Sequence, residues 1–386
     1  MNALFALALG LSTYAVSPIT PLIMDGYAIN RGTASFLTSL VFLTHVLFSI
    51  PAGILMRKLG PKWQISLGWA AAATPCLSFL SGNYYFLLTT RFFFGLSGAL
   101  SIPCWGTLTM QWFRPRELPI INGIIMMMLT IGIAISSFAV VPLSEIFRWE
   151  ITLSLFAVLP LACFPIWLVL GREHQSFVQT ERRLSLLEAW KTLRSRNTLL
   201  LAIADAGPYA LLTAAIAWLP SFYHEVHGMS LVKAGSLMGL LSVAGVLALI
   251  SASFLAVRIQ RRRPLLIIPG ILAGFAGLST FLLADTAIVY VAIFTLGFTC
   301  SFYLPILFTI PMELPNSNPN QVAIRFGALI SFGSIFTFIS PFTVGVTTDL
   351  LGSYIPSLTL FSVLSWSLPV AGALLPETGN PSLRKQ

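Results

Sequence analysis

Charge is the scarcest property of this sequence. Asp, Glu, Lys and Arg together make up 9% of its 386 residues, whereas they make up about 25% of an ordinary soluble domain. Apolar residues make up 56%, and the mean hydropathy is +0.86. Polar surface is therefore too scarce to cover a water-facing globule of this size. This composition excludes most soluble functions and makes lipid the main solvent of the chain.

Cysteine and histidine are also scarce, with four of each. The cysteines stand alone inside apolar runs, so they predict neither a disulfide framework nor a metal site. His224 and His227 flank Glu225, but no further ligand-like residue stands near them. The chain has no G-x-x-x-x-G-K-S/T loop that would bind ATP, and no cluster of His, Asp or Ser within the apolar runs that would indicate a membrane enzyme. We expect no metal, no cofactor and no enzymatic activity.

Long apolar runs make up most of the chain. A helix needs about 20 residues to cross the hydrocarbon core of a bilayer, and twelve runs of about this length predict an all-α integral membrane protein. The longest runs can bend at Pro103 and Pro305, because proline removes a backbone donor inside a helix. The predicted spans are 2–23, 34–56, 64–81, 85–111, 119–142, 150–171, 198–222, 230–256, 264–283, 286–312, 321–346 and 354–375.

The basic residues between the spans predict the orientation of the chain. If the N-terminus is cytoplasmic, eighteen of the 22 Lys and Arg residues face the cytoplasm. Arg31, Arg148 and Lys233 fall outside, and Arg91 falls within the fourth span. Such a bias is the usual topology signal of a membrane protein. It explains the net charge of +9 without nucleic-acid binding, and it predicts a multi-pass plasma-membrane protein with both termini in the cytoplasm.

One long hydrophilic stretch, 172–197, divides the spans six and six. Its apolar residues recur at helical spacing among charges, which predicts an amphipathic linker helix on the cytoplasmic face. An offset of 200 residues pairs eleven identical residues between positions 11 and 60 and their counterparts, with Lys58 opposite Arg258. We therefore expect two pseudo-symmetric six-helix bundles, 1–171 and 198–386.

Local motifs resemble a known family. The loop Gly53-Ile-Leu-Met-Arg57-Lys58-Leu-Gly60-Pro-Lys62 resembles the G-x-L-x-D-R-x-G-R-K signature of the major facilitator superfamily. The stretch Arg91-Phe-Phe-Phe-Gly95-Leu-Ser-Gly98 resembles its R-x-x-x-G-x-G motif, and residues 112–117 are also similar to that family. The phrases PITPLI and FTVGVTTDLLGS resemble its cyanate and nitrate/nitrite branches.

The loop between the second and third spans is predicted to act in a cytoplasmic gate. Its glycines permit a tight turn between antiparallel helices, and its basic residues hold it on the cytoplasmic side. A topogenic loop without a gating role is the alternative. The gate residues predicted in this loop are Gly53, Arg57, Lys58, Gly60 and Lys62.

The signature's carboxylate is replaced by Arg57 in this sequence. Arg57 therefore needs another partner when the bundles close on the cytoplasmic side. By topology the nearest cytoplasmic carboxylate is Glu313, with Arg325 beside it. We expect Glu313 to bridge Arg57 and Arg325 in the outward-open state.

Ionisable residues inside spans are costly unless they face a partner or a cavity, so they are the first candidates for function. Arg91 can bind an anion or form a structural pair with Asp25. His45 can carry a proton near neutral pH or remain a neutral hydrogen-bonding group. Asp205 is the one carboxylate predicted deep within a span; it can carry a proton or play a structural role beside Gly207.

The resemblance implies that the first, fourth, seventh and tenth helices line a central cavity. Aromatic residues on these helices then become candidate cavity residues, although each can equally be a helix-packing residue. The candidates are Tyr14, Trp105, Tyr209, Trp218 and Tyr303.

The sequence as a whole predicts a secondary active transporter. Two bundles would rock around a site near the bilayer midplane and move a small solute by alternating access. One arginine, one histidine and one carboxylate within the spans favour a small organic or inorganic anion coupled to protons. A proton-driven exporter of apolar compounds and a transporter-like solute sensor remain alternatives. The expected partners are the solute, protons and the lipid bilayer, with a monomeric protein and no nucleic acid.

Overall fold

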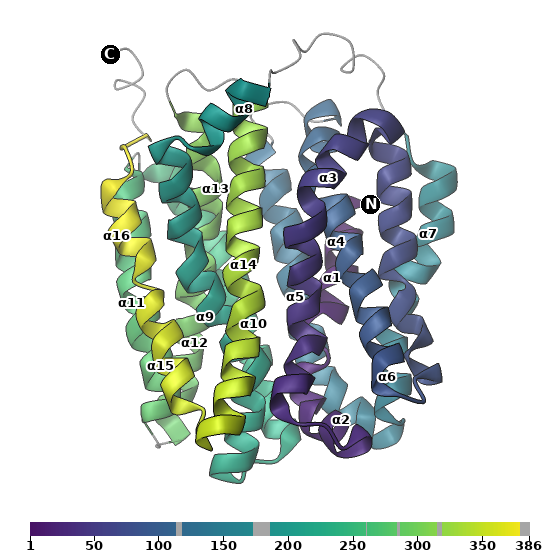
Figure 1. The fold of residues 1–386 in the computed structure, drawn as a ribbon. Coiled ribbons are helices and arrows are strands. Elements are labelled where there is room, and N and C mark those ends of the chain that lie inside the picture. Colours follow the sequence, from purple (N-terminus) through teal and green to yellow (C-terminus); the bar gives the residue numbers. More distant parts are fainter. Residues whose placement is uncertain (113–117, 173–185, 260, 284–285, 315–318, 379–386) are drawn as a thin grey trace.

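The computed structural model describes residues 1–112, 118–172, 186–259, 261–283, 286–314 and 319–378. All regular structure in these ranges is helical (Figure 1). The elements of the first half are α1 (Asn2–Thr13), η1 (Ser17–Ile19), α2 (Thr20–Tyr27), α3 (Arg31–Ala72), η2 (Thr74–Leu80), α4 (Tyr84–Trp112), α5 (Leu118–Ile146), α6 (Trp149–Phe156) and α7 (Val158–Leu170). Those that follow are α8 (Leu186–Leu193), α9 (Arg196–His227), α10 (Leu231–Arg258), α11 (Arg262–Leu282), α12 (Thr286–Phe302), α13 (Leu304–Glu313), α14 (Pro319–Leu351), α15 (Ile355–Leu364) and α16 (Ser367–Leu374).

Eleven helical segments in the described residues are long and apolar enough to cross a membrane. They correspond to all the predicted spans except the third, 64–81. There the crossing consists of the second limb of α3 followed by the short 3-10 helix η2. The predicted all-α, twelve-crossing fold is therefore confirmed, with its third crossing built from two pieces.

The second and third crossings are joined by a sharp kink inside α3. Gly60 has φ +78° and ψ 156°, a backbone conformation that glycine tolerates because it lacks a Cβ. Pro61 then begins the next limb with its fixed φ. The turn expected between Gly53 and Lys62 is thus present at Gly60.

Several crossings are broken near prolines. The first is divided into α1, η1 and α2, with Pro18 and Pro21 in the first turns of the last two pieces. The tenth is divided at Tyr303, and Pro305 lies in the first turn of α13. Because proline lacks an N–H, it fits where a helix begins and would cost a hydrogen bond elsewhere. The helix is thus interrupted next to Pro305, where a bend is predicted.

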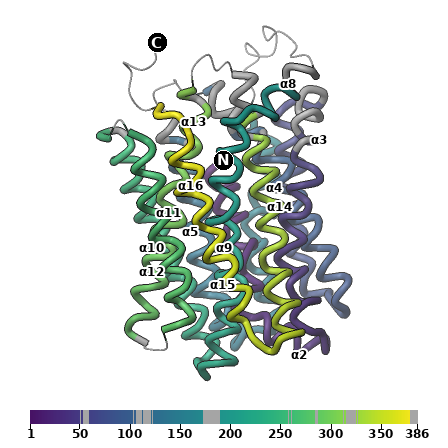
Figure 2. The backbone as a smooth tube through the Cα atoms, turned by 60° about the vertical axis from the view of Figure 1, so that its left-hand side comes forward, coloured from purple at the N-terminus to yellow at the C-terminus, as the bar shows by residue number. Residues whose placement is uncertain are grey.

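The two halves of the chain lie side by side (Figure 1 and Figure 2). α8 lies at the top of Figure 1 and α2 at the bottom; we name these the α8 end and the α2 end. The predicted amphipathic linker helix is present as α8, which packs against α14. The Trp190 side chain on α8 is 56% exposed, and the Arg194 guanidinium lies over its ring.

Two helix pairs make most of the contact between the halves: α3 packs against α14, and α5 packs against α10. One buried apolar cluster contains Tyr14 and Phe42 from the first half together with residues of α9, α10 and α14. The hydrophobic core is therefore continuous between the halves.

The α5–α10 pair is in close contact. A Cβ atom at Gly235 of α10 would lie 3.1 Å from the carbonyl oxygen of Ser137 on α5, and one at Gly239 would meet the Phe138 ring. A Cβ at Gly245 would lie 3.3 Å from Thr130. Three glycines of α10 thus allow α5 to approach, as small residues do in many membrane helix pairs.

Candidate functional site

Asp205 lies on α9 with its carboxyl group almost fully buried, and the residue is 4% exposed. The Tyr303 hydroxyl donates a 2.8 Å hydrogen bond to its Oδ1 atom. Tyr303 stands at the break between α12 and α13, so the interruption of the tenth crossing places its side chain beside the carboxyl. On the other side Gly333 of α14 is so close that a Cβ there would lie 2.8 Å from Oδ2.

A polar face of α9 extends from this carboxyl toward the first half of the chain. Asp205, Tyr209 and Thr213 are four residues apart, so they lie along one side of the helix. The Tyr209 ring lies 6.4 Å from the Phe42 ring of α3. Thr213 Oγ1 and the Tyr14 hydroxyl share a 3.1 Å hydrogen bond. Phenol and hydroxyl groups therefore meet where the two halves touch, with the Asp205 carboxyl one turn farther along α9. We name Asp205, Tyr209, Thr213, Tyr14 and Phe42 the α9 seam.

His45 lies at the edge of the α9 seam. Its ring is 5.9 Å from Phe42 in an edge-to-face arrangement. The Nε2 atom occupies the space that the missing side chain of Gly98 leaves on α4. Gly98 belongs to the R-x-x-x-G-x-G stretch, so one role of that glycine is to make room for the imidazole. Whether His45 carries a proton stays a prediction.

Arg91 is 2% exposed and binds backbone carbonyl groups. Its Nη1 and Nη2 atoms donate to the carbonyls of Ser12 and Thr13 at 2.7 and 2.6 Å, and its Nε atom donates to Leu37 at 2.9 Å. The carbonyls at the end of α1 have no partners within the helix, so the guanidinium caps the broken first crossing and ties it to α3. Among the described residues no ion pair joins Arg91 to Asp25.

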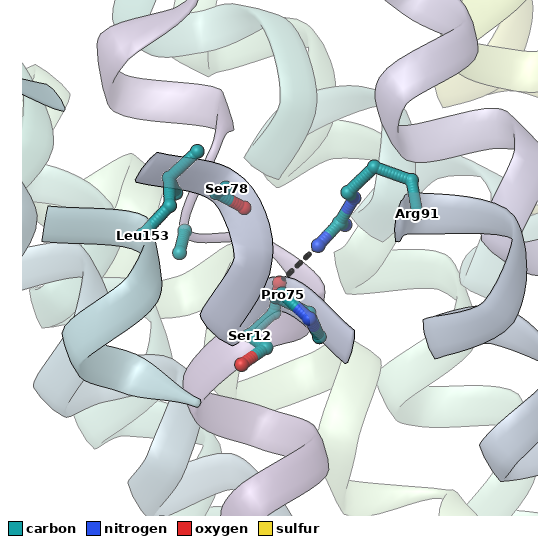
Figure 3. A pocket seen from close by; sticks show the side chains of 6 residues that line it. Ser12, Pro75, Ser78, Arg91 and Leu153 are labelled. Carbon is teal, nitrogen blue, oxygen red and sulfur yellow. Dashed lines mark hydrogen bonds between the residues drawn. The ribbon is translucent and has the colours of Figure 1, made fainter. Parts of the chain in front are cut away.

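A cavity of about 10 Å³ adjoins this guanidinium (Figure 3). That volume suffices for about one water molecule. It is too small for a solute in this conformation. The residues that line it are Ser12, Ala15, Pro75, Ser78, Arg91 and Leu153.

The predicted cavity aromatics divide into two groups. Tyr14, Tyr209 and Tyr303 lie along the α9 seam or on its carboxyl. Trp105 packs near Phe5, with ring centroids 6.1 Å apart, in the core of the first half. Trp218 donates a hydrogen bond to the Pro341 carbonyl at 2.8 Å, within the second half. Tyr14 and Tyr303 thus have hydrogen-bond partners on α9, whereas Trp105 contacts a ring and Trp218 a carbonyl group within their own halves.

The predicted cytoplasmic gate is only partly described. The side chains of residues 53–58, and with them those of Arg57 and Lys58, lie outside the described residues. The Lys62 carbonyl accepts a 3.2 Å hydrogen bond from Trp167 Nε1. The loop thereby contacts α7.

Glu313 has two partners in the second half of the chain. Arg262, at the start of α11, donates to both of its carboxylate oxygens at 2.7 and 3.1 Å, and Thr378 donates at 2.9 Å. Glu313 thus joins α11, α13 and the segment after α16, and no signal in the sequence indicates the Arg262 contact. The bridge to Arg57 and Arg325 is expected in the outward-open state, and the Arg57 side chain lies outside the described residues, so that bridge stays a prediction.

Sequence reasoning missed a charged cluster at the α2 end that joins the two halves. Arg31 at the start of α3 pairs with Glu225 at 2.6 Å and with Asp349 at 3.7 Å. Tyr354 accepts from Arg31 at 3.0 Å and donates to Glu225 at 2.9 Å. Burial raises the pKa of Tyr354, so its hydroxyl keeps the proton that it donates. We name Arg31, Glu225, Asp349 and Tyr354 the α2-end latch.

No local signal in the sequence identifies the α2-end latch. Arg31 and Glu225 are 194 residues apart, and Arg31 and Asp349 are 318 apart. The one available hint is that Arg31 departs from the cytoplasmic bias of the basic residues.

Comparisons with known proteins agree with this architecture. An uncharacterized protein of Campylobacter jejuni is 25% identical over 221 residues, which cover 57% of this chain and 68% of that protein. The uncharacterized transporter YybO of Bacillus subtilis is 22% identical over 246 residues, covering 57% and 55%. The probable nitrate transporter NarT of Staphylococcus haemolyticus is 27% identical over 154 residues, covering 39% of each chain. The matches to the latter two thus span about half of those proteins or less.

Solved structures share the fold over nearly the whole chain. An inward-facing bacterial homologue of the human lysosomal transporter Spinster matches with a TM-score of 0.72 at 15% identity, covering 96% of this chain and 94% of that one. The Escherichia coli fucose:proton symporter FucP matches with a TM-score of 0.69 at 15% identity, covering 97% and 98%. At this identity the likeness concerns the fold alone.

The model of the Major Facilitator Superfamily matches residues 3–341. This range includes the three motifs between residues 53 and 117, the α9 seam, the first ten crossings and most of the eleventh. The chain therefore belongs to the Major Facilitator Superfamily, and it is a membrane transporter and not an enzyme.

Proposed function

We propose that this protein is a secondary active transporter that moves a small solute by alternating access and couples that movement to protons. The observation that carries the proposal is the surroundings of Asp205. A carboxyl group inside a span needs a partner or a function, and the hydrogen-bond donor that Asp205 has is the neutral phenol of Tyr303. Among the described residues no cation pairs with it. A proton is then the natural means of neutralising it.

The α9 seam is the proposed solute site. It offers the hydroxyls of Tyr14, Tyr209 and Thr213 at the contact between the halves, and His45 stands at its edge. Neutral N–H and O–H donors of this kind suit a small anion. The similarity to probable nitrate transporters supports the same substrate class. Arg91 would act without contacting the solute, by holding in place the end of α1, next to Tyr14.

The proposed motion separates and rejoins the halves, with residues 1–171 and 198–386 as the moving bundles and 172–197 as the link. The α2-end latch ties the bundles at one end. We infer that this end faces outward, with both termini in the cytoplasm of a cell whose plasma membrane holds the protein as a monomer. The described conformation would then be closed to the outside.

The test measures the uptake of nitrate, nitrite, cyanate and formate into proteoliposomes, with and without a pH gradient. Asp205→Asn should abolish accumulation against a gradient but leave solute exchange, because the neutral amide resembles the protonated acid. Asp25→Asn, which alters an exposed carboxyl on α2, is the matched control and should behave as wild type. Undiminished proton-driven uptake in Asp205→Asn would exclude the coupling role.

A further inference from the structure

We propose that Gly333 is a positioning residue for proton coupling: by lacking a side chain, it keeps the Oδ2 atom of Asp205 open to receive the proton. The inference rests on the proposed function of Asp205 as the proton carrier. It adds the atom that takes the proton and the residue, on a different helix, that leaves room for it.

The two oxygens of this carboxyl have different surroundings. Oδ1 accepts the hydrogen bond from the Tyr303 hydroxyl at 2.8 Å. Oδ2 accepts no hydrogen bond from any residue that the structure describes, and it faces the backbone of α14 at Gly333. A proton arriving at Oδ1 would compete with the Tyr303 hydrogen for the same side of the oxygen. Oδ2 is therefore the oxygen that can take a proton without rearrangement.

A methyl group at position 333 would occupy the space beside Oδ2. Its carbon would lie 2.8 Å from that oxygen, closer than a carbon and an oxygen pack without a bond. The carboxyl cannot move aside freely, because Tyr303 holds its other oxygen. Nor can α9 retreat, because Gly207 already brings it against the backbone of Leu364 on α15. An added methyl must therefore displace either the carboxyl or the water that would bring its proton.

No fixed charge competes with this steric effect among the described neighbours of the carboxyl. The titratable groups that face it are Tyr303 from the α12–α13 break, Cys300 of α12 next to Tyr303, and Tyr209 on α9 itself. α14 contributes the backbone of Gly333, and the first half contributes Phe42 and, beyond it, His45. Each of these titratable groups is neutral or can be neutral, so a substitution at position 333 changes no charge near the carboxyl. What it changes is the access to Oδ2.

The chain supplies a matched control on the same helix. A Cβ at Gly327 would meet no atom within 4 Å, whereas one at Gly333 meets the carboxyl. Gly327→Ala and Gly333→Ala make the same chemical change in α14, and both raise helix propensity equally. A difference between the two variants therefore reports on the carboxyl and not on the helix.

The experiment is an infrared pH titration of purified protein in lipid vesicles, without solute. The band of the protonated Asp205 carboxyl is identified by its loss in Asp205→Asn. Gly327→Ala should titrate as wild type, and the midpoint in Gly333→Ala should be displaced by about one pH unit, a tenfold change in proton affinity. A Gly333→Ala titration that overlays those of wild type and Gly327→Ala would overturn the proposal.

The Tyr303→Phe background gives a second test of the assignment of the proton to Oδ2. Tyr303→Phe frees Oδ1, so the carboxyl gains another open oxygen, and Gly333→Ala should then add no further displacement. An equal displacement with and without Tyr303 would refute the assignment of the proton to Oδ2.

Nitrate transport separates this inference from the proposed function. Gly333→Ala should reduce proton-driven accumulation about tenfold and spare exchange, and it should add no loss in the Asp205→Asn background. If Asp205→Asn itself retains accumulation, the coupling role fails, and Gly333 no longer positions a coupling group. If Asp205→Asn loses accumulation but Gly333→Ala does not, only the present inference fails.

Discussion

The α2-end latch gives the most direct test of the proposed motion. Arg31 contacts Glu225, Asp349 and Tyr354, all of which belong to the other half of the chain. Arg31→Ala removes the contacts of this side chain together and leaves the backbone N–H groups of Arg31 and Gly32 bonded to Asp349. If the latch holds the halves together at this end, its loss must favour the conformation that is open there.

The size of the effect follows from the exposure of the pair. The side chains of Arg31 and Glu225 are 31% and 24% exposed, so the ion pair contributes about 1 kcal/mol, at the upper end for surface pairs. The hydrogen bond to Tyr354 contributes about 1 kcal/mol more. A total of about 2 kcal/mol shifts the ratio of the two conformations roughly 30-fold.

The measurement is the labelling rate of a cysteine that replaces Phe36, in protein whose four native cysteines are replaced by serine. The centroids of the Phe36 ring and the Phe342 ring of α14 are 5.1 Å apart, so Phe36 is partly covered while the halves touch. An impermeant maleimide should label this position roughly 30-fold faster in Arg31→Ala. Arg148→Ala breaks an ion pair with Glu150 within the first half and serves as the control. Equal labelling rates in the two variants would refute the latch.

Three further substitutions test other contacts. Arg91→Lys should destabilise the protein by about 2 kcal/mol in thermal unfolding, because an ammonium group cannot replace the three charged hydrogen bonds of the guanidinium. Unchanged stability together with a raised KM would instead favour direct contact of Arg91 with an anion. Gly132→Ala should cost about 1 to 3 kcal/mol, because a Cβ there would meet the backbone of α1, and Gly82→Ala, which faces open space, should unfold as wild type. Glu313→Gln should cost about 2 kcal/mol by weakening the pair with Arg262, and an unchanged unfolding temperature would contradict the observed pairing.

The crossings were predictable because lipid imposes one requirement on every span. Each must present about 20 apolar residues, and that signal is local in the sequence. The breaks inside the spans were less predictable, although they follow local signals too. Pro18 and Pro21 divide the first crossing, and Pro75 lies in the 3-10 end of the third, but a proline in a membrane helix can also be tolerated without a break.

The site was only half predictable. Asp205 could be identified because a carboxyl deep in a span is rare and costly. Its partner Tyr303 is 98 residues away, and only the fold brings the two together. The partners of Arg91 are backbone carbonyls, which every residue possesses, so no residue type could reveal them. Gly333 acts by the side chain that it lacks, and a sequence does not show what would fill that space.

The close contact of α5 with α10 has a consequence for how the halves can turn. Along this pair Gly235 of α10 faces the Ser137 carbonyl of α5, and Gly239 receives the Phe138 ring. Separating the two helices would remove that ring from its place and leave a void beside Gly239, which close-packed interiors disfavour. The α5–α10 pair can therefore stay assembled as a pivot while contacts elsewhere between the halves are exchanged.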